Sequence, residues 1–262
     1  MDGPARWPPL EETALTPRTL LLLAILPAAL TACTSPPAPA LEFASSAKSV
    51  VVAPLNVAVR APADLAGKGD PVWTELLSYL QEQDRQVAVI SPLSAERLWL
   101  AAISDLDLSD RQAALRTGYS RFARELAGHR DFDLLVVPSL VMRPAHVSGL
   151  HASWDGVQRP VPNAATAVHR GVGDLMGPGS DFLTGGLTGK VAAASLHVVV
   201  LRADGTRLYD GLGGLDVLQE ARRDNTPDGT LRFAARAQPF SNREWVAEGV
   251  ERAFEGPLLT AR

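Results

Sequence analysis

The chain has 262 residues, with 25 lysines and arginines against 29 aspartates and glutamates, which gives a formal net charge of −4 at pH 7. This balance provides no basic surface for phosphate groups, so we expect no nucleic-acid partner. Cys33 is the only cysteine, and therefore no disulfide can form within the chain.

A leader-like segment precedes the part of the chain that can fold. After Arg18, residues 19–30 form a largely apolar run without a charged residue. This run suits the hydrophobic region of an export signal, but it is shorter than the roughly 20 apolar residues that span a bilayer. The sequence therefore predicts a signal peptide over residues 1–32.

The run ends in Leu30-Thr31-Ala32-Cys33, which resembles the lipobox of bacterial lipoproteins. The resemblance implies cleavage before Cys33, lipidation of its thiol and attachment to a membrane through the acyl chains. Thr34 follows the cysteine where some lipoproteins have aspartate, which implies the periplasmic face of the outer membrane in an envelope with two membranes. An ordinary signal peptide with an accidental cysteine and an uncleaved anchor are the alternatives.

Residues 33–45 are rich in proline, alanine and hydroxyl side chains, a composition typical of a flexible tether. The remaining residues, 46–262, number about 215 and suit one domain. Within it, residues 50–59 predict a buried strand, and Asp70-Pro71 predicts the start of a helix that runs to about Gln83. Residues 86–90 alternate and end before a proline, which suits a strand parallel to the first and completes a βαβ unit.

Two further helices and a third strand follow. Residues 94–103 have a helical pattern, and Ser109-Asp110-Arg111-Gln112 predicts a capping box for a helix that ends at Gly128. Residues 132–141 predict a buried strand with a proline after its apolar stretch, like the first strand. We therefore expect both strands in one sheet.

Antiparallel pairs are predicted in the second half of the domain. Asp155-Gly156 suits a turn between strands at 146–154 and 157–161. An Asp-Gly turn also separates residues 193–202 from 207–214, which is a strong hairpin signal.

Residues 162–190 contain seven glycines and few large apolar side chains, so we expect a loop or mobile insertion there, with at most a short helix. Limited proteolysis is expected to cut this insertion first. Ser241-Asn242-Arg243-Glu244 predicts the cap of a final helix that stops at Gly256-Pro257. The predicted fold class is α/β, a mixed sheet with βαβ units, a late antiparallel hairpin and flanking helices.

Four segments together resemble a group of periplasmic lipoproteins: residues 50–55, residues 133–138, the hairpin from Ser195 to Gly214 and the closing helix from Asn242. The group includes the curli-secretion lipoprotein, the lipoprotein activators of penicillin-binding proteins and the N-terminal domain of the Tol-system propeller protein. The resemblance lies in the pattern of strands and contains no catalytic motif. It implies a domain that binds proteins or builds assemblies.

Motifs for chemistry are missing from the sequence. Residues 184–191 fail the spacing of a phosphate-binding loop, and residues 171–177 miss the dinucleotide pattern by one residue. The chain has neither a Gly-x-Ser-x-Gly elbow nor a His-Glu-x-x-His pair. We therefore expect neither catalysis nor a cofactor.

Isolated ionisable residues give no stronger signal. His146 and His151 are an odd number apart in a predicted strand, so they are expected on opposite faces and no metal site is expected. Asp204, Asp210 and Asp216 could form a carboxylate set, but the first two precede glycine or lie in a turn, where aspartate is ordinary.

Trp154 and Arg159 are the candidate partner surface, because tryptophan and arginine are enriched at binding hot spots. The alternative for Trp154 is a side chain that caps the edge of the sheet. The sequence thus predicts a non-catalytic, membrane-anchored envelope lipoprotein that presents an α/β domain to an unidentified envelope protein or to itself. The alternative is a hydrolase or ligand-binding protein with a deep pocket near residues 162–190.

Overall fold

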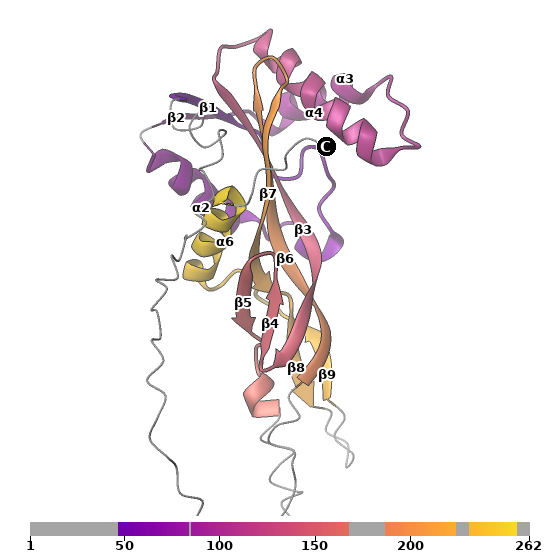
Figure 1. Cartoon of the computed structure of the whole chain (residues 1–262), viewed down its shortest axis with the longest axis vertical. Helices are drawn as coiled ribbons and strands as arrows, with labels where there is room; N and C mark the ends of the chain where they lie inside the picture. The colour runs from indigo at the N-terminus through magenta and orange to yellow at the C-terminus, as the bar shows by residue number, and fades with distance from the viewer. Residues whose placement is uncertain (1–46, 84, 168–186, 224–230, 256–262) are drawn as a thin grey trace, which may run out of the picture. The chain divides into compact units, whose positions relative to one another are not determined.

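The structure is a computed structural model that describes residues 47–83, 85–167, 187–223 and 231–255 (Figure 1). All of these residues belong to one unit of the chain. The predicted signal peptide, Cys33 and the tether to residue 45 lie outside the described residues, as does the middle of the glycine-rich insertion.

A parallel βαβ unit forms the first part of the sheet. β1 (Ser49–Val52) pairs in parallel with β2 (Gln86–Val89), and α2 (Asp70–Gln81) connects the two strands. β1 also pairs in parallel with the start of β3 (Leu134–Gly149). The predicted βαβ unit and the common sheet of the two proline-bearing strands are confirmed.

The second part of the sheet is antiparallel. β6 (Leu187–Arg202) pairs with β3 along its whole length and forms a hairpin with β7 (Arg207–Val217). At the turn, Gly205 has a φ of 84° and the Thr206 N–H donates to Asp204 Oδ1 at 2.8 Å. The predicted late hairpin is confirmed. β6 begins earlier than predicted, so residues 187–190 of the expected insertion belong to a strand.

β3 is one long strand where the sequence predicted two. The Val136 carbonyl accepts from the Ala53 N–H, and the Pro138 carbonyl accepts from the Asn56 N–H, so both face the side on which β1 ends. Pro138 lacks an N–H, but an N–H at this position would point toward the β1 side and away from β6. The proline therefore interrupts no hydrogen bond of the β3–β6 ladder. The strand continues past it to Gly149.

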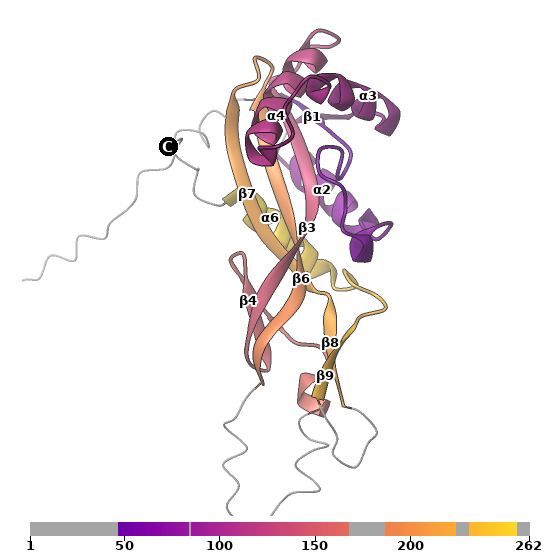
Figure 2. The same cartoon turned by 90° about the vertical axis from the view of Figure 1, so that its right-hand side faces the viewer.

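Shorter hairpins complete the strands. β4 (His151–Trp154) and β5 (Val157–Pro160) meet at the predicted Asp155-Gly156 turn, where both residues have positive φ. β8 (Gln219–Arg223) pairs with β9 (Leu231–Ala235) in a separate two-stranded sheet that the sequence did not predict, because both segments are short and β8 is mostly polar. Figure 2 shows β4, β8 and β9 beside the lower parts of β3 and β6, at the end away from α3 and α4.

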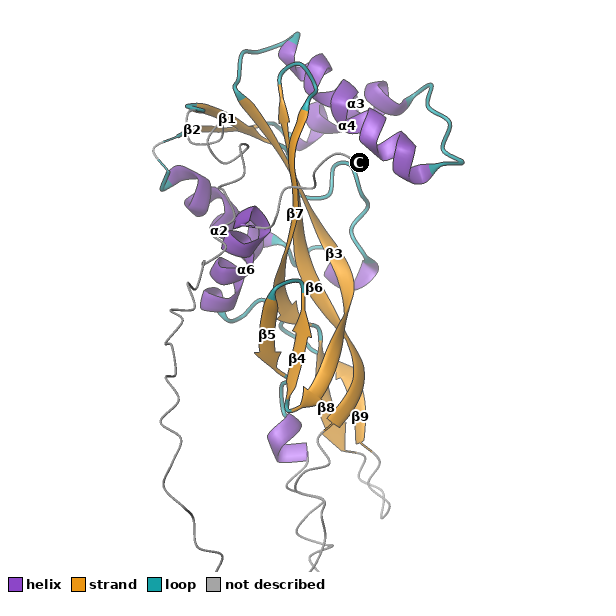
Figure 3. Cartoon of the chain, viewed as in Figure 1, coloured by secondary structure: helices purple, strands orange, loops and turns teal. Residues whose placement is uncertain are grey.

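Two pairs of helices cover opposite faces of the sheet (Figure 3). α2 and α6 (Arg243–Glu255) pack on the face that includes Val50 and Val52, whereas α3 (Pro92–Ile103) and α4 (Arg111–Ala127) pack on the face of Val51. Alternate residues of β1 thus enter different layers, which is why its sequence is apolar on both faces.

Two predicted helix caps are wrong by one residue. The carboxylate of Asp110, and not the Ser109 side chain, accepts from the first amides of α4. Asn242, and not Ser241, caps α6, since its Oδ1 accepts from the Trp245 N–H at 3.2 Å. Asp and Asn are both good caps, so the geometry of the preceding turn decides between neighbours that the sequence cannot rank.

A third apolar cluster lies at the far end of β3 and β6 and consists almost wholly of alanine and valine, with Trp154 as its largest described member. Residues 164–167 form a short helical turn against it, and Ala164 is buried. This turn is the short helix that the sequence allowed within the expected insertion.

α6 lies unusually close to β7 because glycines face each other. A Cβ added at Gly213 would lie 1.9 Å from the carbonyl oxygen of Gly249 and 2.5 Å from the Ala253 nitrogen. A Cβ at Gly249 would lie 2.4 Å from the Gly214 carbonyl oxygen. Because no side chain fits between these backbones, the glycines allow α6 to pack directly against the backbone of β7.

Candidate functional site

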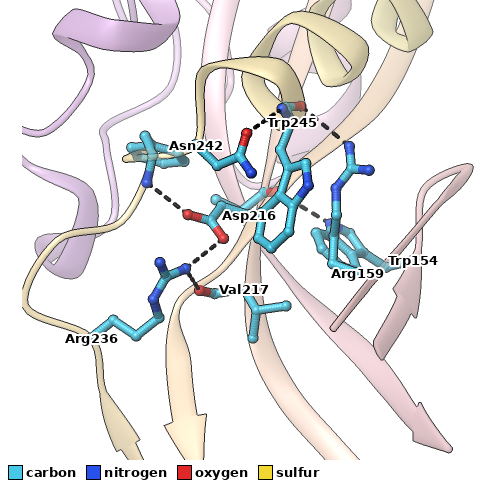
Figure 4. A network of polar contacts seen from close by, with 9 residues as sticks. Trp154, Arg159, Asp216, Val217, Arg236, Asn242 and Trp245 are labelled. Atoms are coloured by element: carbon cyan, nitrogen blue, oxygen red, sulfur yellow. Dashed lines mark hydrogen bonds and ion pairs between the residues drawn. The ribbon is translucent and has the colours of Figure 1, made fainter. Parts of the chain in front are cut away.

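Trp154 lies inside the domain. Its side chain is only 7% exposed, and its indole Nε1 donates to the Ala194 carbonyl at 3.2 Å (Figure 4). Its ring also lies against Gly214, where an added Cβ would come within 2.9 Å of Nε1. A tryptophan held in this way fills the junction between the β4–β5 hairpin and the sheet.

Arg159 is buried beside it. The guanidinium donates to Glu248 at 2.5 Å and to the Trp245 carbonyl at 3.2 Å, and it lies 5.4 Å from the centre of the Trp245 ring. Only 5% of Arg159 is exposed. Since a partner docking on the folded domain could reach neither Trp154 nor Arg159, the structure corrects the hypothesis that these two residues form a partner surface.

Asp216 is the centre of a second buried polar network (Figure 4). It is 1% exposed, accepts from Arg236 at 2.5 Å and accepts from the Phe240 N–H at 2.7 Å. Phe240 has a φ of 63°, a conformation that is uncommon for an aromatic residue. The carboxylate thus fixes the connection that leads from β9 into α6.

We expect Asp216→Ala to lower the free energy of unfolding by about 3 kcal/mol, because it leaves a mostly buried guanidinium without its carboxylate partner and a buried N–H without its acceptor. Chemical denaturation followed by circular dichroism measures the loss. Glu255→Ala is the control, since Glu255 pairs with Arg252 on the surface and its loss should cost less than about 0.5 kcal/mol. Equal effects for the two variants would contradict this role of Asp216.

A polar cluster on the α4 face of the sheet brings serine, histidine and aspartate together. His197 lies opposite Ser139 in the β3–β6 ladder, and its Nε2 lies 2.6 Å from Asp210 Oδ1. Asp210 therefore lies within β7, the strand that the sequence predicted over residues 207–214. Ser139 is fully buried, so its hydroxyl is not accessible to a substrate.

Burial and neighbouring charges shift the pKa values of two residues in this cluster. Burial acts to raise the pKa of Asp210, but the hydrogen bond from His197 and the charges of His197 and Arg207 outweigh it, so this pKa lies below its usual value. Burial, reinforced by the Asp210 charge, raises the pKa of Tyr119 to about 12.

The Tyr119 hydroxyl makes stability depend on pH at the alkaline end. In the unfolded chain a tyrosine ionises near pH 10, roughly two units lower, so unfolding releases a proton between about pH 10 and 12. The stability that Tyr119 contributes is complete below pH 10 and falls by about 1.4 kcal/mol per pH unit above it. Between pH 8 and pH 11, the free energy of unfolding should therefore fall less for Tyr119→Phe than for the wild type. Urea titrations at both pH values measure this fall, and an equal fall for the two proteins would contradict the prediction.

His146 and His151 lie on the same side of the sheet. The turn at Gly149 separates them into β3 and β4, where His146 pairs with Ser153 and His151 with Ser148, and both histidines are exposed. The expectation of opposite faces is wrong because the two residues belong to different strands. Among the residues that the structure describes, no group of three or more His, Cys, Asp or Glu side chains could hold a metal ion.

The flank of the glycine-rich insertion has a small hollow of about 320 Å³, lined by Asn163, Thr166, Ala167 and residues 221–223. Asn163 and Arg222 both bond to Glu220 beside it, so the nearest polar side chains are satisfied within the domain. Residues 168–186 lie outside the described residues. The hollow therefore offers little support for the hydrolase or ligand-binding alternative.

A larger and more apolar cavity of about 440 Å³ lies at the carboxyl ends of β1 and β2, where open α/β sheets commonly bind ligands. We call it the apolar cavity. Its lining comes from the loop after β1, the start of α2, the end of β2 and one residue of β3: Pro54, Leu55, Asn56, Ala61, Leu65, Gly67, Gly69, Asp70, Trp73, Val89, Ile90, Pro92 and Leu140.

Asn56 builds one wall of the apolar cavity. It has a φ of 64°, its amide donates to the carbonyls of Val59 and Leu140, and its Oδ1 accepts from the Leu140 N–H. These bonds tie the loop after β1 to β3. Gly69 sets the opposite wall, since a Cβ there would lie 2.9 Å from Leu55.

Exposed apolar side chains gather next to the apolar cavity. Val89 in its wall is 46% exposed, and Leu93, one residue beyond Pro92, is 58% exposed. Leu100, seven residues further along α3, is 55% exposed. Helix α3 is thus apolar on more than its buried face, and its sequence alone shows this pattern.

A second cleft, of about 470 Å³, lies between α2 and α6 and is lined mainly by glutamates. Two of them have basic partners: Glu75 with Arg243 and Glu248 with Arg159. The cleft therefore belongs in part to the internal ion pairs of the domain.

Neither protein-family profiles nor curated proteins match this chain. The helices in the described ranges include none that is long and apolar enough to cross a membrane. The apolar cavity and the side chains around it are therefore the candidate functional site on structural grounds alone.

Proposed function

We propose that the chain is a bacterial envelope lipoprotein, anchored by acyl chains on Cys33, that presents its α/β domain to a protein partner. The lipobox-like Leu30-Thr31-Ala32-Cys33 supports the anchor, and the tether that follows separates it from β1. Thr34 favours the periplasmic face of the outer membrane in an envelope with two membranes. The role is that of a binding protein without catalysis of its own.

The observation that carries the binding role is the apolar surface at the end of β2. Contiguous exposed apolar patches mark interaction sites on soluble proteins, whereas single exposed apolar residues are ordinary. Val89 and Leu93 are exposed on either side of Pro92, which lines the apolar cavity. We place the partner-binding surface there.

Site-specific photo-crosslinking in intact cells tests this function. A photoreactive residue in place of Leu93 should give a crosslinked product of discrete mass with the full chain. The same residue in place of Leu150, which is 38% exposed at the end of β3, is the control and should give none. Crosslinking that is absent from both positions, or equal at both, would contradict the proposal.

A further inference from the structure

β2 forms an edge of the sheet. It lies first in the strand order and pairs with β1 alone among the described strands (Figure 1). The N–H groups of Gln86 and Ile90 donate to the carbonyls of Lys48 and Val52, which shows that the even-numbered residues of β2 turn their polar groups toward β1.

The intervening residues face the other way. Successive residues of a strand direct their backbone groups to opposite edges, so Val87 and Val89 point their N–H and C=O groups away from β1. None of the described residues pairs with this short row of donors and acceptors, so the row can pair with another strand. Val89 also contributes its side chain to the wall of the apolar cavity, so the edge and the cavity are continuous.

The lining of the apolar cavity indicates the chemistry of an occupant. Trp73, Leu55 and Leu140 provide an apolar surface for one side chain of the occupant. Asp70 is the one charged residue in the lining, and its carboxylate would attract a cation at the rim. An extended segment with an apolar residue next to a basic one complements both features.

We infer that an extended segment of the partner protein adds as a strand to the free edge of β2 and inserts an apolar side chain into the apolar cavity, with a neighbouring lysine or arginine beside Asp70. The mode is strand addition, in which backbone hydrogen bonds give affinity and side-chain pockets give specificity. This inference rests on the proposed function and specifies how its partner is recognised.

Selection from a phage-displayed library of random 12-residue peptides tests the inference on the full chain purified in detergent. Enriched peptides should combine β-branched or aromatic residues with a lysine or arginine. Val89→Pro should weaken the best synthetic peptide by about tenfold or more, because the proline removes an outward donor and blocks the edge. The β1–β2 ladder should survive, since the lost N–H points away from β1.

Two further variants sharpen the test. Asp70→Asn should weaken binding about threefold through the loss of one exposed charge. Leu108→Ser, which changes an exposed apolar residue outside the apolar cavity, should leave the affinity unchanged. Circular dichroism and melting curves verify that each variant is folded.

Hydrogen exchange provides an independent readout. The Val87 and Val89 amides should exchange rapidly in the free protein and become protected when the peptide binds. Protection in the free protein would mean that this edge is already covered, by the chain itself or by a second copy, and would overturn the inference. So would a selection that yields no binder, or peptides that bind wild type and Val89→Pro equally. Crosslinking at Leu93 without binding at the edge would leave the proposed function intact and refute this inference alone.

Discussion

Replacing Cys33 by serine is expected to release the protein from the membrane without destabilising the domain. Under the proposed lipidation, the thiol carries every acyl chain of the anchor, and two or three chains are what make such attachment stable. Residue 33 lies 14 positions before Ala47, the first described residue, which is buried against the core. Membrane fractionation should therefore show nearly complete loss of the protein from the membrane fraction, while the melting temperature of the domain stays the same.

The processing of this variant gives a second readout. A precursor that cannot receive diacylglycerol is no substrate for the lipoprotein peptidase, so Cys33→Ser should either be cut by the general signal peptidase or remain uncleaved. The two products differ in mass, and the uncleaved one also in solubility. Thr34→Ser is the matched control and should stay membrane-bound. Retention of Cys33→Ser with normal processing would contradict the proposed anchor.

Gly213→Ala is expected to destabilise the fold strongly. The added methyl would meet the Gly249 carbonyl oxygen at 1.9 Å and the Ala253 nitrogen at 2.5 Å, and both of these atoms are backbone. α6 would have to move away from β7, which disturbs the packing of Val246 and Val250 in the core. We expect a loss of about 3 kcal/mol, the upper end of the usual cost of overpacking, measured by urea denaturation.

The control for this variant is Gly128→Ala. Gly128 ends α4 with a φ of −67°, which alanine adopts freely, and its nearest neighbour to an added Cβ lies 3.3 Å away. The cost there should remain below about 1 kcal/mol. If Gly213→Ala were as stable as Gly128→Ala, the close approach of α6 to β7 would not exist in solution.

Local sequence signals predicted much of the fold because the relevant physics is local. Asp155-Gly156 and Asp204-Gly205 suit turns with positive φ, and both turns are where the sequence placed them. Runs of valine buried on both faces identified β1 and the start of β3. The glycine composition of residues 162–190 misled at the C-terminal end of that range, because pairing with β3 makes residues 187–190 part of a strand.

The candidate site could not be predicted in the same way. The apolar cavity joins the loop after β1, the start of α2, the end of β2 and Leu140, segments that only the tertiary fold brings together. Trp154 and Arg159 are the reverse case: their residue types suggested a surface, but bonds to Ala194 and Glu248 hold them inside. Residue type indicates what a side chain can do, whereas its burial depends on contacts distant in the sequence.

The intact mass of the mature protein, isolated from its native membrane, tests the central claim most directly. If the chain is a lipoprotein, the mature N-terminus is Cys33, and the mass equals that of residues 33–262 plus a diacylglyceryl group, with or without a third acyl chain. Tandem mass spectrometry should place the added mass on the first residue. A mature protein that begins at any other residue, or that begins at Cys33 without acyl mass, would contradict the account.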